Sequence, residues 1–317
     1  MTLAIRDILS PDEIRDLTAR SDLRGALYIL QTWSLIAMIF SVLVLSPNPL
    51  TFVLAVILLG GQQLACAVIS HEAVHRTLFR TRSLNDGLTD WLCARPIWID
   101  VARYRQHHIR HHSHTGVEGD PDLSLVDPFP CSRRSLRRKL LRDVLGLSGL
   151  RRIVGLLGMD FGILRYTVAA EVERLPRNGR RWYHYAATGV KNLAPVVISN
   201  LAIFLVLAAF DAGWAYSAWV LAYLTTFSLY LRIRSIAEHA CTERVEDYLR
   251  NTRTTRAGWL ARLTVAPMHV NYHIEHHLMA SVPFHSLPKL HRILSDRGAV
   301  QPASSYASVL RQASAAH

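Results

Sequence analysis

The stretch LTFVLAVILLGGQQLACAVISHEAVH, residues 50–75, joins a long apolar run to a pair of histidines. Residues 50–70 carry no charge and have about the 20 residues that a helix needs to cross roughly 30 Å of hydrocarbon. The following HEAVH matches H-E-x-x-H, in which two histidines one helical turn apart hold zinc in a class of metalloproteases. We therefore expect a membrane helix that ends in candidate metal ligands.

Three further stretches are similarly apolar, namely 27–45, 193–210 and 212–231. Half of the 317 residues are hydrophobic and the mean hydropathy is positive, which is unusual for a soluble protein of this length. Only SPNP separates the first two stretches and only Asp211 the last two, so we expect two tight helical hairpins. The predicted fold is an all-α integral membrane protein with four transmembrane helices in two hairpins and a helical cytoplasmic cap.

The positive charge is placed asymmetrically. The hairpin tips hold no Lys or Arg, whereas residues 76–181 hold 20 of the 36 and the tail after residue 231 holds 11. The positive-inside rule then predicts an inner or plasma membrane protein with both termini and the middle segment in the cytoplasm. This topology accounts for the net charge of +12, and because no nucleic-acid-binding motif accompanies it, no nucleic-acid partner is expected. The basic run RRSLRRK, residues 133–139, is left with two interpretations, an acidic electron carrier or anionic lipid as its partner.

We interpret the chain as one domain, 1–317. Its segments are an N-terminal interfacial segment 1–26, a first hairpin 27–70, a cytoplasmic segment 71–186, a second hairpin 187–231 and a cytoplasmic segment 232–317. No signal peptide is expected, because the first 25 residues mix both signs of charge. Ser10, Pro11 and Glu13 predict a capping box at the start of a short helix, whose Ile14 and Leu17 would form an apolar edge for the membrane surface.

Two features argue against other classes of structure. Residues 146–166 are apolar but interrupted by Arg151, Arg152 and Asp160, which favours a surface or core helix over a fifth span. The four cysteines form no C-x-x-C pattern, so neither a zinc ribbon nor a disulfide framework is indicated.

Most of the 16 histidines gather at three places: HEAVH at 71–75, HHIRHHSH at 107–114 and HIEHH at 273–277. In a helix, positions i, i+3 and i+4 project from one face. The spacing therefore predicts three helical faces, formed by His71 and His75, by His108, His111 and His112, and by His273, His276 and His277. Imidazole suits iron, zinc and copper, and eight ligands exceed the needs of one ion, so a two-metal site is predicted.

This number of histidines argues against a protease. A zinc protease of this pattern needs one further ligand rather than six, and the acidic motif in this chain is DPDL instead of the Asp-Gly ligand motif of membrane metalloproteases. Glu72 is then better placed to hold the N–H of a histidine than to act as a base.

These motifs resemble those of the membrane fatty acid desaturase family, which also includes hydroxylases, ketolases and decarboxylases. The resemblance covers most of the chain and rests on HEAVH, on HHIRHH followed by GDPDL, on RSIAEH, and on NYHIEHHLMASVPFHSLPKLH. It implies a histidine-rich diiron centre (Fe2+/Fe3+) at the cytoplasmic face, with O2 as co-substrate. There, two electrons and O2 serve to break an unactivated C–H bond of a lipid or fatty acyl chain.

Mapped onto this chain, the resemblance makes the eight box histidines metal ligands and adds His239 of RSIAEH as a ninth. Some members place a water-linked asparagine four residues before the ninth histidine, and here that position is Ser235. No HPGG haem-binding pattern occurs, so electrons are expected from a separate ferredoxin, rubredoxin or cytochrome b5-type donor.

Other residues are candidates for support of the site. Glu72, Glu238 and Glu275 adjoin ligating histidines and could orient them, although solvated positions are an equal alternative, and Asp120 and Asp122 could cap a helix or brace a ligand. The remaining histidines, among them His107, His269, His285 and His291, are assigned to outer or packing positions. An apolar substrate tunnel is predicted near the boxes, with candidates Trp91, Ile97, Trp98, Tyr104, Thr264 and Met268. The alternative for the tryptophans is an interfacial anchor.

The ligand pattern does not separate desaturation from hydroxylation, since both begin with removal of one hydrogen. A non-enzymatic alternative is a histidine-rich membrane metal-binding protein, such as a transporter or a sensor. A transporter would place ligands within the spans, yet the four apolar stretches contain no His, Asp or Glu. The sequence thus favours an enzyme.

Overall fold

The structure, a computed structural model, describes residues 5–316 and is almost entirely helical. Its α-helices are α1 Ile5–Ile8, α2 Pro11–Leu17, α3 Asp22–Leu45, α4 Pro49–His75, α5 Val101–His114, α6 Leu123–Val126, α7 Arg133–Val144, α8 Leu147–Asp160, α9 Trp182–Ala208, α10 Tyr216–Leu224, α11 Thr226–His239, α12 Tyr248–Asn251, α13 Trp259–Leu263, α14 His273–Leu278, α15 Leu287–Asp296 and α16 Tyr306–Ala313. Short π- and 3-10 helices are η1 Leu84–Leu88, η2 Asp90–Ala94, η3 Arg95–Ile97, η4 Gly213–Ala215, η5 Pro267–His269 and η6 Phe284–Ser286. Two short parallel strands, β1 Thr255–Arg256 and β2 Ser304–Ser305, pair with each other.

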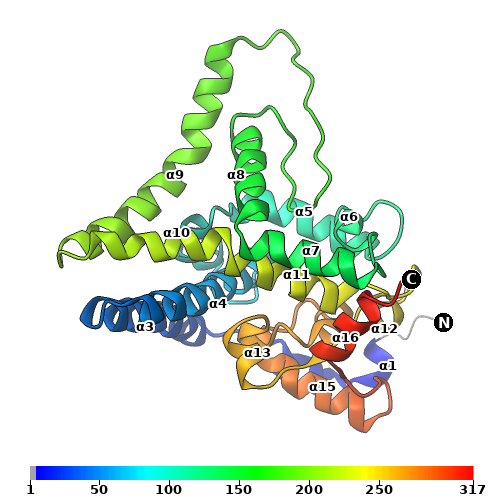
Figure 1. Ribbon diagram of the computed structural model, residues 1–317. Coiled ribbons are helices and arrows are strands. Elements are labelled where there is room, and N and C mark those ends of the chain that lie inside the picture. The colour runs from blue at the N-terminus through cyan, green and yellow to red at the C-terminus, as the bar shows by residue number, and fades with distance from the viewer. Residues whose placement is uncertain (1–4, 317) are drawn as a thin grey trace.

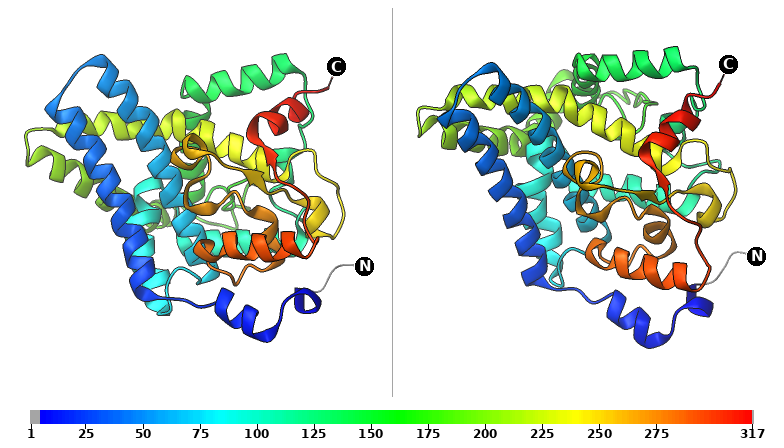
Figure 2. Two further views of the ribbon diagram at one scale, coloured as in Figure 1. Left: turned by 90° about the horizontal axis from the view of Figure 1, so that it is seen from below. Right: turned by 60° about the horizontal axis from the view of Figure 1, so that its bottom comes forward.

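Helices α3 and α4 form the first predicted hairpin and lie side by side in all views (Figures 1 and 2). The turn is tight because Asn48 caps α4: its side chain accepts hydrogen bonds from the backbone N–H groups of Leu50 and Thr51, and Pro49 occupies the first helical position. Helix α4 then passes through the centre of the molecule, against α3, α5, α10 and α11, and ends at the two histidines of HEAVH.

The second apolar pair is less regular than predicted. Helix α9 is long and apolar enough to cross a membrane, as are α3 and α4, and these are the three such helices within residues 5–316. The fourth predicted span is instead divided at Thr225 into α10 and α11. Figure 1 shows α9 diverging from α10, and only 6% of the apolar window of α9 is buried, against 72% for α4. Three of the four predicted spans thus correspond to single long helices.

The division at Thr225 is explained by tertiary contacts on either side of it. Thr225 has φ −110° and ψ −85°, outside the helical region. On one side, Arg152 of α8 donates a hydrogen bond to the carbonyl oxygen of Tyr223 at 2.6 Å, and on the other, the hydroxyl of Thr226 donates to Val56 of α4 at 2.7 Å. These partners take up polar groups at the ends of the two helices, so the break is satisfied without a proline.

Helix α2 begins as predicted. Ser10 and Glu13 form the expected capping box of α2, with the Ser10 N–H donating to the Glu13 carboxylate at 2.8 Å. The apolar edge was placed wrongly, however. Leu17 is fully buried in the protein core, with Ile14 partly buried against it, because α2 packs on α15 rather than presenting this edge outward.

Candidate metal centre

Four chain segments deliver the nine predicted histidines to one place. The end of α4 supplies His71 and His75, α5 supplies His108, His111 and His112, the last residue of α11 is His239, and α14 supplies His273, His276 and His277. Within each helix the spacing puts these rings on one face, as predicted. Asp100 caps the N-terminus of α5, because its side chain accepts a hydrogen bond from the backbone N–H of Arg103 at 2.9 Å.

Five of these histidines form a first group. One ring nitrogen from each lies within 4.8 Å of the others, and the members are His71, His75, His108, His112 and His276. His112 lies at the centre of this group: its Nε2 is 3.0 Å from Nε2 of His108 and 3.0 Å from Nε2 of His276. The group therefore combines three elements that are far apart in sequence.

The other four histidines form a second group beside the first. His111, His239 and His277 converge in the same manner, and His239 converges with His273 and the carboxylate of Glu238. Nε2 of His273 lies 2.7 Å from Nε2 of His239 and 3.1 Å from Nε2 of His277. The two groups are adjacent, since the rings of His112 and His277 stack with centroids 4.2 Å apart.

The spacing of these nitrogens fits metal ions. Two nitrogens bound to one metal at about 2.1 Å in neighbouring positions lie roughly 3 Å apart, which matches the Nε2 separations in both groups. Several ring nitrogens are buried without a hydrogen-bond partner among the described residues, namely both nitrogens of His71, Nε2 of His75 and Nδ1 of His273. Buried polar groups without partners are rare and costly, so bound cations would explain the arrangement.

Burial also keeps the rings in the form that binds metals. It lowers the pKa of His239 to about 3, and it lowers the pKa of five other histidines well below the ordinary value, namely His108, His112, His273, His276 and His277. These side chains are neutral at pH 7, and neutral imidazole is the ligand form.

His111 differs from the others because it contacts an acidic turn. Burial lowers its pKa, but the hydrogen bond to Asp120 and the charges of Asp122 and Asp120 outweigh burial, so the pKa is raised. Nδ1 of His111 lies 2.8 Å from Asp120, whose other carboxylate oxygen accepts the N–H of Gly116. Asp122 lies 2.8 Å from Nε2 of the buried His107. Both carboxylates of GDPDL thus contact histidines of the 107–114 cluster.

The three glutamates have other partners. Glu72 accepts hydrogen bonds from Thr77 and from the backbone N–H of Phe284, and its carboxylate lies 4.0 Å from Nδ1 of His71, too far for a hydrogen bond. Glu238 pairs with Arg234 at 2.7 Å and lies 3.6 Å from Nδ1 of His273. All three are buried, including Glu275, so a solvated position is excluded for each.

Glu275 forms a link that sequence reasoning did not identify. Its carboxylate bonds to Nδ1 of His291 at 2.7 Å and accepts the hydroxyl of Thr254 at 2.6 Å. A second unpredicted contact joins the hydroxyl of Thr115 to Nδ1 of His277 at 3.2 Å. Thr115 directly follows the second histidine box, which was the only sequence signal for it.

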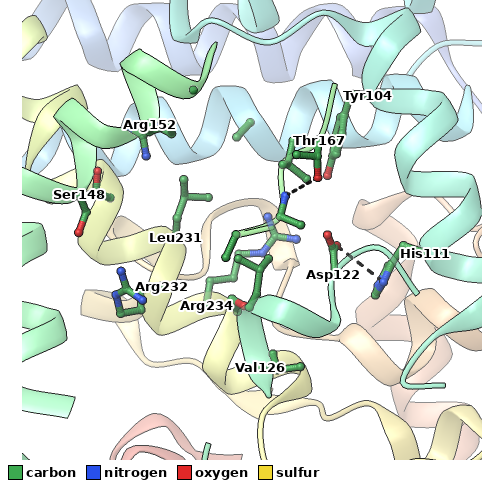
Figure 3. Close-up of a pocket in the computed structure, with 18 of the residues that line it drawn as sticks. Tyr104, His111, Asp122, Val126, Ser148, Arg152, Thr167, Leu231, Arg232 and Arg234 are labelled. Atoms are coloured by element: carbon green, nitrogen blue, oxygen red, sulfur yellow. Dashed lines mark hydrogen bonds and ion pairs between the residues drawn. The ribbon is translucent and has the colours of Figure 1, made fainter. Parts of the chain in front are cut away.

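A cavity of about 590 Å³ adjoins the second histidine group. Figure 3 shows residues of α5, α8 and α11 around it, with His111 and Tyr104 at one side and Ser148, Arg152 and Arg232 at the other. Its lining includes His108, His111, His239 and His273 together with apolar side chains such as Ala67, Met159, Phe227 and Leu231. These four histidines are therefore in direct contact with the cavity.

The predicted tunnel residues divide into two sets. Ile97, Trp98 and Tyr104 line the cavity. Thr264 is buried and Met268 partly buried, but neither belongs to the lining, and Trp91 is 46% exposed. Trp91, on η2, thus lies at the protein surface and outside this cavity, a position compatible with the alternative of an interfacial anchor.

Comparison with known proteins gives two matches. Residues 47–306 match the fatty acid desaturase family. The chain is also 27% identical over 294 residues to a dihydrorhizobitoxine desaturase of Bradyrhizobium elkanii, an alignment that covers 89% of this chain and 78% of that protein.

Proposed function

The chain belongs to the fatty acid desaturase family, and we propose that it catalyses O2-dependent desaturation of a fatty acyl or related lipid chain at two histidine-bound iron ions. The observation that carries this proposal is the division of nine histidines into two adjacent groups beside a cavity. Overall, a CH2–CH2 unit and O2 would take up two electrons and two protons and yield a CH=CH unit and two molecules of water.

Each group of histidines would hold one ion. The first would be bound by His71, His75, His108, His112 and His276, and the second by His111, His239, His273 and His277. When bound, the metal pair supplies the redox chemistry that activates O2. Ser235 lines the cavity near the second group, so a water held there could complete that shell.

The protein residues would position the reactants. Asp120 fixes the ring of His111 through Nδ1 and leaves Nε2 free for a metal. Ile97, Trp98 and Phe227 give the cavity apolar walls, along which an alkyl chain would lie and water would be excluded.

The two electrons would come from a separate carrier protein, such as a ferredoxin, a rubredoxin or a cytochrome b5-type protein. We propose that the active site and both termini face the cytoplasm of an inner or plasma membrane, because the basic residues are concentrated in those segments. Hydroxylation, ketone formation or decarboxylation at the same site remain alternatives within the family. The name of the Bradyrhizobium relative favours desaturation.

Lipid profiling of a heterologous host tests the proposal. Cells that express the wild-type protein with a reductase and carrier should accumulate unsaturated products, and cells that express His112→Ala should not, since His112 lies at the centre of the first group. Hydroxylated products from the wild type would assign the chain to the hydroxylases instead.

A further inference from the structure

The cavity beside the histidines contains more positive charge than its own acidic residues neutralise. Its lining includes five arginines, Arg142, Arg151, Arg152, Arg232 and Arg234. Arg232 pairs with the fully buried Asp143, and Arg234 pairs with Glu238. The remaining acids of the lining, Asp120 and Asp122, bond to histidines. Among residues 5–316, no carboxylate forms an ion pair with Arg142, Arg151 or Arg152, which we call the arginine trio.

The arginine trio comes from other helices than the histidines do. Arg142 is on α7, and Arg151 and Arg152 are on α8, whereas the histidines come from α4, α5, α11 and α14. Figure 3 shows Arg152 and Ser148 at the side of the cavity away from His111. The charged end and the histidine end are therefore separated by the apolar walls around Leu231.

One member of the trio, Arg152, is held in place, and two members have unused donors. The guanidinium of Arg152 lies over the rings of Tyr223 and Phe227, at 4.4 Å and 4.9 Å, and one of its nitrogens bonds to the carbonyl oxygen of Tyr223. Nε of Arg152 and Nε of Arg142 are buried with no partner among the described residues. Burial of cationic donors without acceptors is costly, so an anion bound at these two guanidinium groups would stabilise them.

We propose that the arginine trio binds an anionic oxygen group of the substrate, a carboxylate or a phosphate, while the carbon to be oxidised lies at the histidine end. Arginine suits both groups because its planar donors match their oxygen atoms. This inference rests on the proposed function. It implies that the substrate is an amphiphile whose head group and alkyl chain both enter the cavity. The distance between the arginine trio and the histidines would then determine which carbon is oxidised.

The other source of anionic oxygen is the bilayer itself. Exposed apolar side chains surround the trio on α7 and α8, among them Leu141, Val144, Leu150 and Val154, so this hairpin is suited to a membrane surface. However, all three arginines line the cavity, where a ligand that lies inside it can contact them. The geometry therefore favours a ligand inside the cavity.

Binding measurements on the purified full-length protein in phosphatidylcholine nanodiscs test the proposal. The probes are dodecanoate, dodecyl phosphate and methyl dodecanoate, which share the alkyl chain and differ in charge. We expect the wild type to bind at least one anion about tenfold more tightly than the ester, as charge-assisted hydrogen bonds predict. The probe that binds best identifies the head group as carboxylate or phosphate.

Three variants locate the anion site. Arg151→Gln and Arg142→Gln should each lower the preference for the anion severalfold without changing the affinity for the ester. Arg151 is exposed, so its replacement leaves the fold intact. Arg138→Gln is the matched control, because Arg138 is an exposed arginine of α7 outside the cavity lining, and it should behave as the wild type.

Equal affinity of the wild type for ester and anions would overturn the inference. A second outcome would also overturn it: Arg151→Gln and Arg142→Gln lose binding to phosphatidylglycerol vesicles but keep the wild-type preference for the anionic probes. That result would show that the trio contacts the lipid surface instead. Turnover separates this inference from the proposed function. If the ester were oxidised at the same rate as the anions, the head-group site would be contradicted and the proposed function would stand. If the anions bound tightly but no probe were oxidised, the desaturase reaction would be contradicted and the head-group site would stand.

Discussion

Nδ1 of His111 lies 2.8 Å from the carboxylate of Asp120, and this contact leaves Nε2 of the same ring for the second histidine group. The carboxylate is itself held by the N–H groups of Gly116 and Asp122. The turn formed by GDPDL thus fixes the direction in which one candidate ligand points.

Replacing this carboxylate should weaken one metal position and spare the other. For Asp120→Asn, we expect the affinity of the second position to fall roughly 10- to 100-fold, because partners that orient a ligating histidine typically contribute that much. Iron retained per chain at graded chelator concentrations measures the effect. Asp127→Asn, which alters an exposed ion pair with Arg244, is the control and should retain iron as the wild type does. Identical retention in both variants would show that Asp120 has no orienting role.

The two groups should each account for one metal ion. Purified protein should contain about two irons per chain, since one ion would leave half of the converging imidazoles without a partner. His71→Ala and His239→Ala each remove a member of a different group and should lower iron content and abolish turnover. His184→Ala, at an exposed position of α9, should do neither. One zinc per chain, with activity that survives the loss of His273 and His277, would contradict the diiron assignment.

The two tryptophans between the first boxes should differ in effect. Trp98 lines the cavity and donates from its indole to Asp160 at 2.8 Å, whereas Trp91 is at the surface. We expect Trp98→Ala to lengthen the accepted chain or shift the oxidised carbon, because it removes bulk from the cavity wall. Trp91→Ala should leave the product spectrum unchanged. Gas chromatography of products at equal iron content measures both, and unchanged products from Trp98→Ala would exclude a wall role.

The close contact between α4 and the C-terminal end of α13 should depend on a glycine. A Cβ atom at Gly61 would lie 2.0 Å from the carbonyl oxygen of Leu263, which is backbone and cannot move aside alone. Gly61→Ala should therefore destabilise the protein by about 1–3 kcal/mol, as overpacking does. Thermal unfolding in detergent measures this, with Gly87→Ala as the control, since a Cβ there meets no atom within 4 Å. Equal melting temperatures would show that the contact relaxes freely.

Orientation in the membrane is testable with reporter fusions. The charge distribution predicts a cytoplasmic reporter after Arg138 and at either terminus. Loop 46–48 between α3 and α4 is the control, and a reporter inserted there should lie on the opposite side. A lumenal or periplasmic signal after Arg138 would contradict both the topology and the cytoplasmic site.

Helical periodicity was sufficient to group eight of the nine converging histidines, whereas His239 was added by the family resemblance. The ring positions of His108, His111 and His112 follow from the residue spacing of one helix. The first hairpin follows from two apolar stretches joined by a short turn, and the capping box from Ser10 and Glu13. Each of these features depends on residues a few positions apart. The sequence carries that information locally, and so the predictions agree with the structure.

Features that depend on distant residues were not predictable in the same way. The break at Thr225 depends on Arg152 and on contact with Val56, and no proline or glycine marks it. Glu72 bonds to the backbone of Phe284 rather than to its neighbour His71. In each case, a partner more than 70 positions away decides which hydrogen bond forms.

The candidate ligands span the chain from His71 to His277 and come from four helices. During synthesis, neither metal position can be complete before α14 has left the ribosome and docked beside α4, α5 and α11. Iron loading would then serve as the last checkpoint of biogenesis: a chain that is truncated, or whose membrane helices insert incorrectly, would stay free of metal and open to proteolytic disposal. We therefore expect cellular iron supply to control the lifetime of this protein as well as its activity.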